Sequence, residues 1–198
     1  IVPGPGRVLI TGPSDGTRPA LAAELHARTG RGPLTVMSMA LDGGAAVLER
    51  VRSRPAGTLF IDDLDLASDG EAAALQLALD QGGQPGHGLV VLAGPAAILD
   101  RPGRLAALAW SADARIQVPA WEHRSGDVPE IMAALVAAAG AQVRWTDPAR
   151  ARLAARTWRS WPEIRAWARM IAQRAPAVAD PALLDGIAAG FDAGDPQT

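Results

Sequence analysis

Short apolar runs alternate with stretches of helical periodicity through the first part of the chain, which has 198 residues. The runs with the length and composition of buried strands lie at residues 8–11, 34–37, 58–61, 89–93 and 114–118. Helical patterns lie between them at 19–29 and 45–54, and the capping-box spacing of Ser68 and Glu71 predicts a third helix. Because strands that alternate with helices favour a parallel sheet with crossover helices, we expect a five-stranded α/β domain.

The alternation of strands and helices stops after Pro119. The helices expected beyond it lie at 128–139, 148–157 and 160–174. Asp147 is expected to cap the second of these helices, with Pro148 in its first position. We therefore divide the chain into an α/β domain (1–120), a small helical domain (121–176) and a linker with one short helix (177–198).

The last of these three helices carries an apolar stripe with tryptophans in it. The stripe consists of Trp161, Ile164, Trp167, Ala168 and Ile171. From Arg144 to Arg174 there are eight arginines against two acidic residues, a charge of +6 that leaves −8 on the remainder of this −2 chain. Interleaved arginine and tryptophan also occur in nucleic-acid interfaces. The helical spacing instead predicts a tryptophan core and a solvated arginine face that suits an acidic partner.

Composition excludes several classes of site. All 19 basic residues are arginine, and the absence of cysteine excludes disulfides and cysteine-bound metals. No stretch approaches the roughly 20 apolar residues of a membrane span, and residues 1–12 lack the pattern of a signal peptide. His26, His87 and His123 fall on three different expected elements, so no metal site is predicted. We expect a cytoplasmic domain.

Residues 7–18, RVLITGPSDGTR, read as a strand, a glycine-containing turn and a cation that opens a helix. This is the pattern of a phosphate-binding loop, G-x-x-x-x-G-K-[ST], whose N–H groups cradle phosphate while lysine reaches it and the hydroxyl holds Mg²⁺. The candidate phosphate-binding residues are Gly12, Ser14, Asp15, Gly16, Thr17 and Arg18. Thr17 replaces the second glycine, Arg18 the lysine and Pro19 the hydroxyl. Since a planar guanidinium is a poor copy of a lysine ammonium, we expect impaired nucleotide binding.

Asp62 and Asp63 follow the most apolar strand pattern of the chain. In phosphate-loop folds the first such carboxylate holds Mg²⁺ through water, and a second acidic residue, usually glutamate, orients the attacking water. Asp63 keeps the charge but is about 1.5 Å shorter than glutamate. Asp62 and Asp63 are therefore the candidate catalytic carboxylates, and the alternative is a solvated strand end.

The chain resembles the AAA+ ATPase domain of sigma-54-dependent transcriptional activators. Residues 55–64, PAGTLFIDDL, resemble their GGTLFLDE strand, and residues 8–12, VLITG, their VLITGE before the phosphate loop. Residues 118–129, VPAWEHRSGDVP, are similar to LPPLRERREDIP at the hinge of the family, and 145–155 and 158–171 to its lid. The resemblance implies an AAA+ P-loop fold, with a five-stranded parallel sheet and a small C-terminal helical lid. ATP and Mg²⁺ are the cofactors of such domains, but for this chain we expect none, or only weak binding of ATP with Mg²⁺.

The departures from this family concern its functional residues. Residues 41–56 are too few to hold the GAFTGA loop that contacts the sigma factor, and Pro95 stands at the sensor asparagine. Arg104 matches the first arginine of the finger region, but Trp110 stands at the second and Pro162 at the lid arginine.

The resemblance and its departures together imply a degenerate AAA+ module of a sigma-54-activator-like regulator, with weak or no ATP binding and hydrolysis. One alternative is a functional ATPase that uses Arg18 with Asp62 and Asp63. Another is a nucleotide-free scaffold that pairs with an active AAA+ subunit and supplies Arg104. The expected partners are further copies or another AAA+ subunit, with no membrane, and with DNA only through domains outside these residues.

Overall fold

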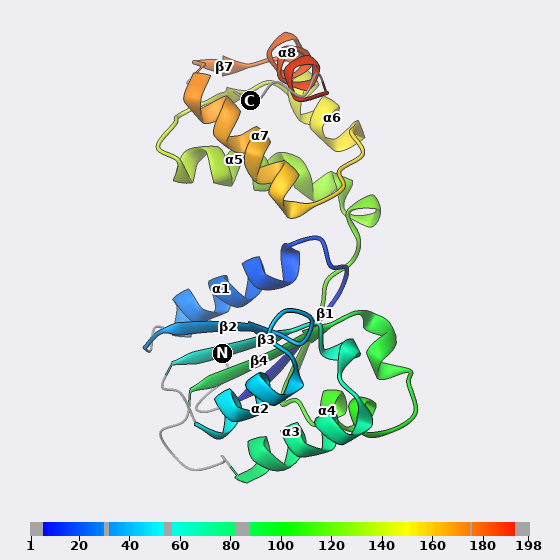
Figure 1. Cartoon of the computed structure of the whole chain (residues 1–198). Helices are drawn as coiled ribbons and strands as arrows, with labels where there is room; N and C mark the ends of the chain where they lie inside the picture. The colour runs from blue at the N-terminus through cyan, green and yellow to red at the C-terminus, as the bar shows by residue number, and fades with distance from the viewer. Residues whose placement is uncertain (1–5, 30–31, 54–56, 82–87, 175, 193–198) are drawn as a thin grey trace. The chain divides into compact units, whose positions relative to one another are not determined.

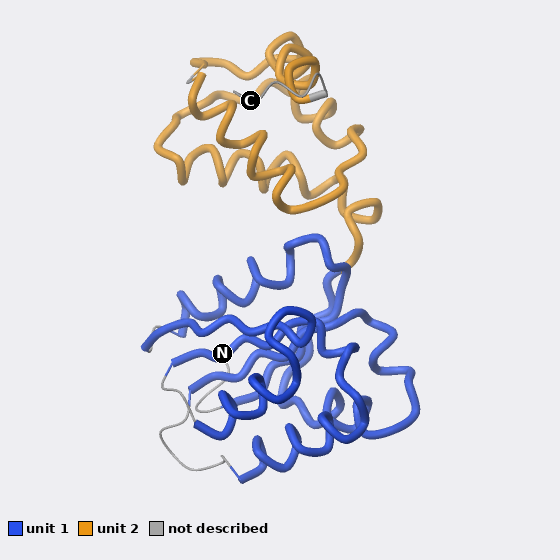
Figure 2. Tube along the Cα trace, viewed as in Figure 1, with its two compact units in different colours: residues 1–118 blue, residues 119–198 orange. Residues whose placement is uncertain are grey.

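The structure is a computed structural model that describes residues 6–29, 32–53, 57–81, 88–174 and 176–192. The chain forms two compact units, 1–118 and 119–198 (Figure 2). Each unit has its own apolar core and is described by itself. None of the helices in the described residues is long and apolar enough to span a bilayer.

The first unit contains a five-stranded parallel sheet with the strand order β2-β3-β4-β1-β5. Its strands are β1 (Arg7–Thr11), β2 (Leu34–Ser38), β3 (Thr58–Asp62), β4 (Leu89–Gly94) and β5 (Ala114–Gln117). Its helices are α1 (Thr17–Thr29), α2 (Gly44–Arg52), α3 (Asp69–Gln81) and α4 (Arg104–Trp110), with 3₁₀ turns η1 (Leu64–Leu66) and η2 (Ala96–Leu99). The expected α/β class and five-stranded parallel sheet are confirmed.

Helices cover both faces of this sheet (Figure 1). Leu9, Ile61 and Leu92 point to the face where α2, α3 and α4 pack. Their neighbours Ile10 and Phe60 point to the opposite face, where Ala22 of α1 is buried against them. Successive residues of a strand point to opposite faces of the sheet. Because helices bury both faces, nearly every strand residue is apolar, and the strands read as continuous apolar runs in the sequence.

Two local sequence predictions can be checked in this unit. Ser68 and Glu71 form the expected capping box, in which Ser68 N–H and its hydroxyl both donate to Glu71 Oε2 at 2.8 and 2.7 Å. Helix α1 begins at Thr17, two residues before the expected start, so Pro19 lies third in the helix rather than first. The first-turn N–H groups of a helix lack intrahelical partners, so proline is tolerated there too. The expected loop at 82–87 lies outside the described residues.

The second unit packs four helices around tryptophan side chains. These are α5 (Val128–Ala138), α6 (Asp147–Ala155), α7 (Trp161–Arg174) and α8 (Pro181–Asp192), preceded by the 3₁₀ turns η3 (Trp121–His123) and η4 (Ser125–Asp127). A short parallel pair joins β6 (Arg144–Trp145) to β7 (Val178–Ala179). Leu184 and Ile187 of α8, the short helix predicted within the linker segment, are buried in the same core as Trp167.

The cap of α6 differs from the expected one. Thr146, not Asp147, is the N-cap, and its hydroxyl accepts a hydrogen bond from Ala149 N–H at 3.3 Å. Both residue types are good caps, and here the chain turns one residue earlier because Thr146 also donates to the Ala179 carbonyl at 3.2 Å. Pro148 consequently lies second in the helix, where its missing N–H again costs nothing.

Candidate functional site

The loop between β1 and α1 joins the centre of the sheet to the first helix. Gly12 N–H donates to the Gly94 carbonyl at 3.1 Å, which extends the β1–β4 ladder by one residue. A Cβ on Gly12 would lie 2.8 Å from the Val118 carbonyl oxygen, so this position has no room for a side chain. Gly16 has a φ of 84°, a conformation that favours glycine. Packing and turn geometry therefore account for both glycines.

An intramolecular carboxylate binds a backbone N–H of this loop. Asp15 Oδ1 accepts a hydrogen bond from Thr17 N–H at 2.9 Å, at the start of the 13-residue helix α1. The N-terminus of a helix favours an anion because its first N–H groups are unpaired and its dipole is positive there. Asp15 thus provides an anion from the chain itself where a phosphate loop would bind phosphate.

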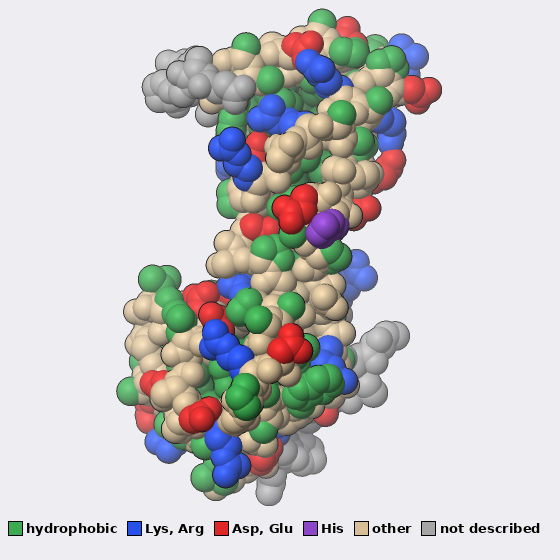
Figure 3. All heavy atoms as spheres, turned by 90° about the vertical axis from the view of Figure 1, so that its right-hand side faces the viewer, with side chains coloured by type: hydrophobic (Ala, Val, Ile, Leu, Met, Phe, Trp, Pro, Cys, Tyr) green, Lys and Arg blue, Asp and Glu red, His purple; other side chains and the backbone are tan. Residues whose placement is uncertain are grey.

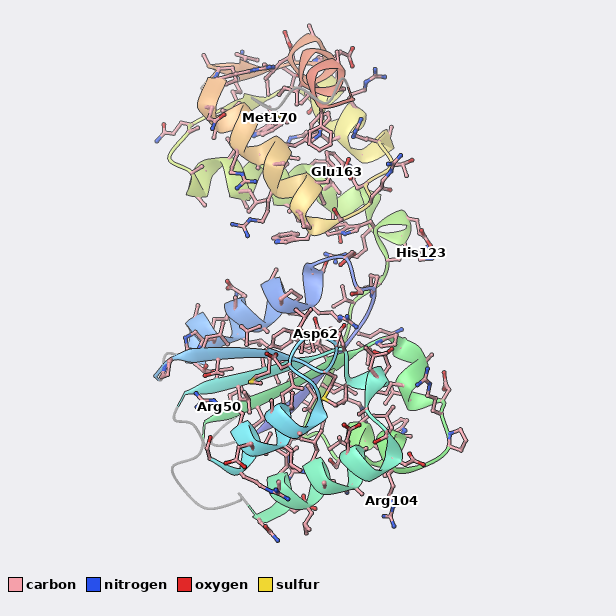
Figure 4. All side chains as sticks on the ribbon, in the orientation of Figure 1. Arg50, Asp62, Arg104, His123, Glu163 and Met170 are labelled. Carbon is pink, nitrogen blue, oxygen red and sulfur yellow. The ribbon has the colours of Figure 1, made fainter. Side chains whose placement is uncertain are left out.

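The cation of the loop points into the protein. Arg18 is 2% exposed, and its Nη2 lies 3.1 Å from Asp62 Oδ1 and 3.2 Å from Asp63 Oδ1. The structure thus brings Arg18, Asp62 and Asp63, which the sequence predicted as site residues, together in one cluster. Figure 4 marks its position by the label of Asp62. The Arg18 guanidinium is held in place by a charge-assisted hydrogen bond to Asp63 and by the ion pair with Asp62.

A serine that the sequence analysis did not select completes the cluster. Ser38, the last residue of β2, donates its hydroxyl to Asp63 Oδ2 at 2.7 Å, and the same Oγ accepts N–H groups from Ala40 and Leu41. In the β2–β3 register, Ser38 lies opposite Asp62. The sequence did contain a signal for Ser38. This residue ends one predicted apolar strand as Asp62 and Asp63 end another, and polar residues at the carboxyl ends of parallel strands lie at the same edge of the sheet.

Asp63 adopts an unusual backbone conformation. Its φ of 56° and ψ of 36° are left-handed, and it is the only non-glycine residue of the described chain with positive φ. Aspartate tolerates this region better than most residues, but the conformation persists where surrounding contacts hold it. Here Arg18 and Ser38 hold the two carboxylate oxygens, and Asp63 N–H donates to Asp62 Oδ1 at 2.8 Å.

The environment raises the pKa of Asp62. Burial disfavours the charged carboxylate and is the largest effect, ahead of the Asp63 N–H bond and the Arg18 charge, which both lower the pKa of Asp62. The nearby Asp63 and Asp65 carboxylates raise it further. Asp62 is therefore a partly buried acid whose negative charge is compensated by Arg18.

The residues present do not fit a magnesium–nucleotide complex in this arrangement. Mg²⁺ requires oxygen ligands, yet Pro19 offers no hydroxyl and the two carboxylates are already bound to Arg18. A divalent cation beside Asp62 and Asp63 would also meet the Arg18 charge within a few ångströms. In the described part of the chain, Thr17 Oγ1 and Arg18 Nε are buried without a hydrogen-bond partner. The Thr17 hydroxyl can donate or accept a hydrogen bond and Arg18 Nε can only donate, so both suit a water molecule or an anion oxygen.

The other sequence-selected residues lie apart from this cluster. Ser14 is exposed in the loop. Arg104 is the exposed first residue of α4, and Figure 4 shows its side chain pointing away from the sheet on the far side from Asp62. Pro95 precedes η2, and Pro162 is an exposed residue near the start of α7 in the second unit.

The expected division of α7 into a tryptophan core and an arginine face is observed. Trp167 and Ile171 are buried, Trp161 is partly buried, and Arg165 and Arg169 are exposed. Several neighbouring arginines are neutralised within the unit, through the ion pairs Arg150–Glu130, Arg152–Asp185 and Arg156–Glu163. Figure 3 accordingly shows acidic and basic side chains interspersed on the face of this unit that it draws.

The described histidines make ordinary contacts. His26 Nδ1 lies 3.0 Å from the Thr58 hydroxyl, and His123 is exposed beside Glu122. No cluster of three or more His, Cys, Asp or Glu side chains suited to a metal ion occurs among the described residues. His87 lies outside them.

Comparison with known proteins identifies the fold. No protein-family model and no curated protein sequence matches the chain. Among solved structures, the Thermotoga maritima RuvB Holliday junction branch migration motor is 17% identical with a TM-score of 0.62, covering 90% of this chain and 59% of that one. The replication initiator DnaA bound to AMPPCP and single-stranded DNA is 12% identical with a TM-score of 0.55, covering 86% of this chain and 56% of that one.

A structure of katanin, solved in a study of its self-assembly, is 18% identical with a TM-score of 0.52, and the match covers 86% of this chain and 58% of that one. The chain therefore spans less than two thirds of the length of these structures. All three are AAA+ ATPases, and at these identities the likeness concerns the fold. The chain has the AAA+ type of P-loop fold, as the sequence predicted.

Proposed function

We propose that this chain is a degenerate AAA+ module that keeps the fold, with weak or no binding and hydrolysis of ATP. The observation that carries this proposal is the buried Arg18 guanidinium bound to both Asp62 and Asp63. Binding of Mg-ATP would require Arg18 to leave two carboxylates, and Asp15 to release the Thr17 N–H. Each exchange replaces an intramolecular partner by a ligand group of the same charge, so the net gain from ligand binding is small.

We further propose that the module belongs to a cytoplasmic regulator similar to sigma-54-dependent activators. The support is the sequence of β3 and its acidic end, together with the hinge-like segment around Pro119–Pro129, in the order of that family. Without the sigma-contacting loop, the module would act in regulation or assembly, through contact with further copies or another AAA+ subunit. DNA binding would reside in domains outside these residues.

Nucleotide binding provides the direct test. A ligand at a hundred times its Kd adds about 2.7 kcal/mol of stability, which raises the Tm of a chain of this size by roughly 5–10 °C. We expect about 5 mM ATP with Mg²⁺ to raise the Tm by less than about 2 °C, with Mg²⁺ alone and ADP as controls. A larger shift specific to ATP would instead support the functional ATPase that uses Arg18, Asp62 and Asp63.

The scaffold alternative has one observation in its favour. Arg104 is exposed at the start of α4 and therefore accessible to another subunit. An active AAA+ partner whose turnover rises with this chain, and falls again with Arg104→Ala, would support the scaffold. Arg101→Ala is the matched control, because Arg101 is an exposed arginine three residues before Arg104, and it donates to the Asp65 carbonyl.

A further inference from the structure

The second unit has a surface groove of about 740 Å³ beside α7. Three of its lining residues, Pro162, Ala166 and Arg169, follow one another at helical spacing and therefore share one face of α7. The segment between α6 and α7 forms another part of the lining, and Phe191 of α8 adds an aromatic side chain. The volume is within the range of about 300–1,000 Å³ that is typical of ligand sites.

The lining of this groove carries a net positive charge. It contains three arginines, Arg156, Arg159 and Arg169, and one carboxylate, Glu163, which gives +2. Glu163 is labelled in Figure 4. Its Oε1 lies 3.3 Å from Arg156 Nη2, and its Oε2 accepts the backbone N–H of Arg159 at 2.9 Å. Both oxygens of Glu163 are therefore engaged, and neither compensates the guanidinium of Arg159 or Arg169.

The side chains of Arg159 and Arg169 are exposed and available to a ligand. Neither guanidinium makes an ion pair or a hydrogen bond within the described part of the chain. Arg150 and Arg152 of the same unit differ in this respect, because each binds an acidic side chain. A guanidinium presents a planar fork of donors that can bind a carboxylate through two hydrogen bonds. The groove thus offers two accessible sites for carboxylates.

The two cations come from well-separated positions of the backbone. Arg169 lies eight residues beyond Trp161, the first residue of α7, which is about 12 Å along the helix axis. Arg159 precedes Trp161 by two further residues. Ala166 and Phe191 supply apolar surface in the same groove. A ligand with two separated negative charges and an apolar group between them matches this arrangement better than one small anion does.

We propose that this groove binds an extended acidic segment of a partner protein, with two carboxylates four residues apart and an apolar side chain midway between them. An extended chain advances about 3.3 Å per residue, so four residues cover about 13 Å. Residues i, i+2 and i+4 of such a segment point to the same side. The two carboxylates then bind Arg159 and Arg169, while the middle side chain packs on Ala166 and Phe191.

The distribution of charge argues against nucleic acid as the occupant. A nucleic acid is bound through a basic surface that neutralises many successive phosphates. Here the nearby Arg150 and Arg152 are paired with Glu130 and Asp185, the groove itself contains a carboxylate, and the chain as a whole carries −2. Two accessible cations suit a short segment with two charges.

A fluorescein-labelled peptide of sequence GSEAFAESG is the probe, and fluorescence anisotropy with the full chain measures its binding. No nucleotide is added, so the result is independent of the function proposed above. We expect saturable binding with a Kd of roughly 0.05–1 mM that weakens as the salt concentration rises, and binding of GSQAFAQSG that is at least about fivefold weaker. No saturable binding of the acidic peptide, equal binding of the neutral one, or tighter binding of labelled hexathymidylate would overturn the proposal.

Variants of exposed residues test the location. Arg159→Gln with Arg169→Gln removes both groove cations and should weaken binding of the acidic peptide about tenfold. Arg165→Gln, at an exposed position of α7 outside the groove lining, should change the Kd less than about twofold. Ala166→Leu fills part of the groove without changing charge and should weaken binding about fivefold, whereas Ala182→Leu, on an exposed position of α8 outside the lining, should leave it unchanged. Wild-type affinity in the double arginine variant, or an equal loss in Arg165→Gln, would refute this site even if Ala166→Leu failed to fold.

Discussion

Nη2 of Arg18 lies 3.2 Å from Oδ1 of Asp63, a residue 45 positions further along the chain. This contact joins the start of α1 to the end of β3 across the first unit. Because Asp62 shares the same nitrogen at 3.1 Å, one cation compensates two partly buried carboxylates. Arg18 therefore has a structural role that the lysine of a phosphate loop does not require, and stability measurements separate the two roles.

Replacement of Arg18 by alanine should lower the free energy of unfolding by about 2–4 kcal/mol, because Asp62 and Asp63 lose their cation. Arg28→Ala is the matched control, since Arg28 is 76% exposed and pairs with Glu24 on the surface of α1, where the expected cost is below about 1 kcal/mol. Urea unfolding followed by circular dichroism gives both values. A cost for Arg18→Ala no greater than that of the control would contradict a structural role.

The pKa of Asp62 predicts a difference in pH dependence between the wild type and Asp62→Asn. Because the folded pKa is raised above the usual 3.8, the folded state holds this proton more tightly than the unfolded state. The wild type should therefore lose stability relative to Asp62→Asn as the pH rises from about 3.8 through the folded pKa, and the difference should then level off. Unfolding midpoints of both proteins between pH 4 and 8 test this sign, and an opposite slope would contradict it.

Gly12 tests whether the loop is kept for packing. Gly12→Ala should destabilise the protein by about 2–3 kcal/mol, because the added Cβ meets the Val118 carbonyl oxygen at 2.8 Å. Gly70→Ala makes the same change in α3, where nothing lies within 4 Å, and should stabilise by about 0.5–1 kcal/mol. Thermal unfolding of the two variants should shift in opposite directions, and a neutral Gly12→Ala would argue against the packing explanation.

The capping box of α3 predicts a second pH effect of the opposite sign. Hydrogen bonds from the Ser68 hydroxyl and N–H lower the pKa of Glu71 below its usual 4.5, so their stabilisation is present above that value and is lost as the pH falls through the folded pKa. Ser68→Ala should cost about 1 kcal/mol at neutral pH and progressively less in acid. In a Glu71→Gln background the cost should not change with pH, and a pH-dependent cost there would assign the effect to another group.

Restoring the phosphate loop should not restore an enzyme. We expect Thr17→Gly with Arg18→Lys and Pro19→Thr to turn over ATP more slowly than about once per minute. Pro95 and Pro162 still stand where the resemblance places a sensor asparagine and a lid arginine, and each lost electrostatic contact typically costs about 10²–10³ in rate. A coupled assay of phosphate release measures the rate, and faster turnover would show that only the loop had degenerated.

The sequence predicted the elements of the fold more completely than the contacts of the site. Strand β3 and the stripe of α7 follow directly from the sequence, because burial on both faces of a strand gives a continuous apolar run and burial of one helix face gives an apolar stripe. The inward direction of Arg18 could not be read in the same way. It depends on the packing of α1 across β3, which brings Asp63 within reach, and no local pattern encodes a contact between residues 45 positions apart.

Some elements of the second unit have local sequence patterns too weak to predict them. The strands β6 and β7 have two residues each, which is too short for any period to be detected. Helix α8 contains Gly186 and Gly190, which lower helix propensity, yet it forms because Leu184 and Ile187 are buried in the core. Tertiary packing decides these elements.

The central place of β1 in the sheet affects how the chain reaches this structure during synthesis. Strand β1 lies between β4 and β5. Strand β4 begins at Leu89, and the N–H of Arg7, the first residue of β1, donates to Asp113, which directly precedes β5 and lies 106 residues later. At a ribosomal rate of about 5–20 residues per second, β1 emerges several seconds before either neighbouring strand exists. The most apolar centre of the sheet is thus the segment that depends longest on protection from aggregation, and the final pairing with β5 closes the unit in a single late step.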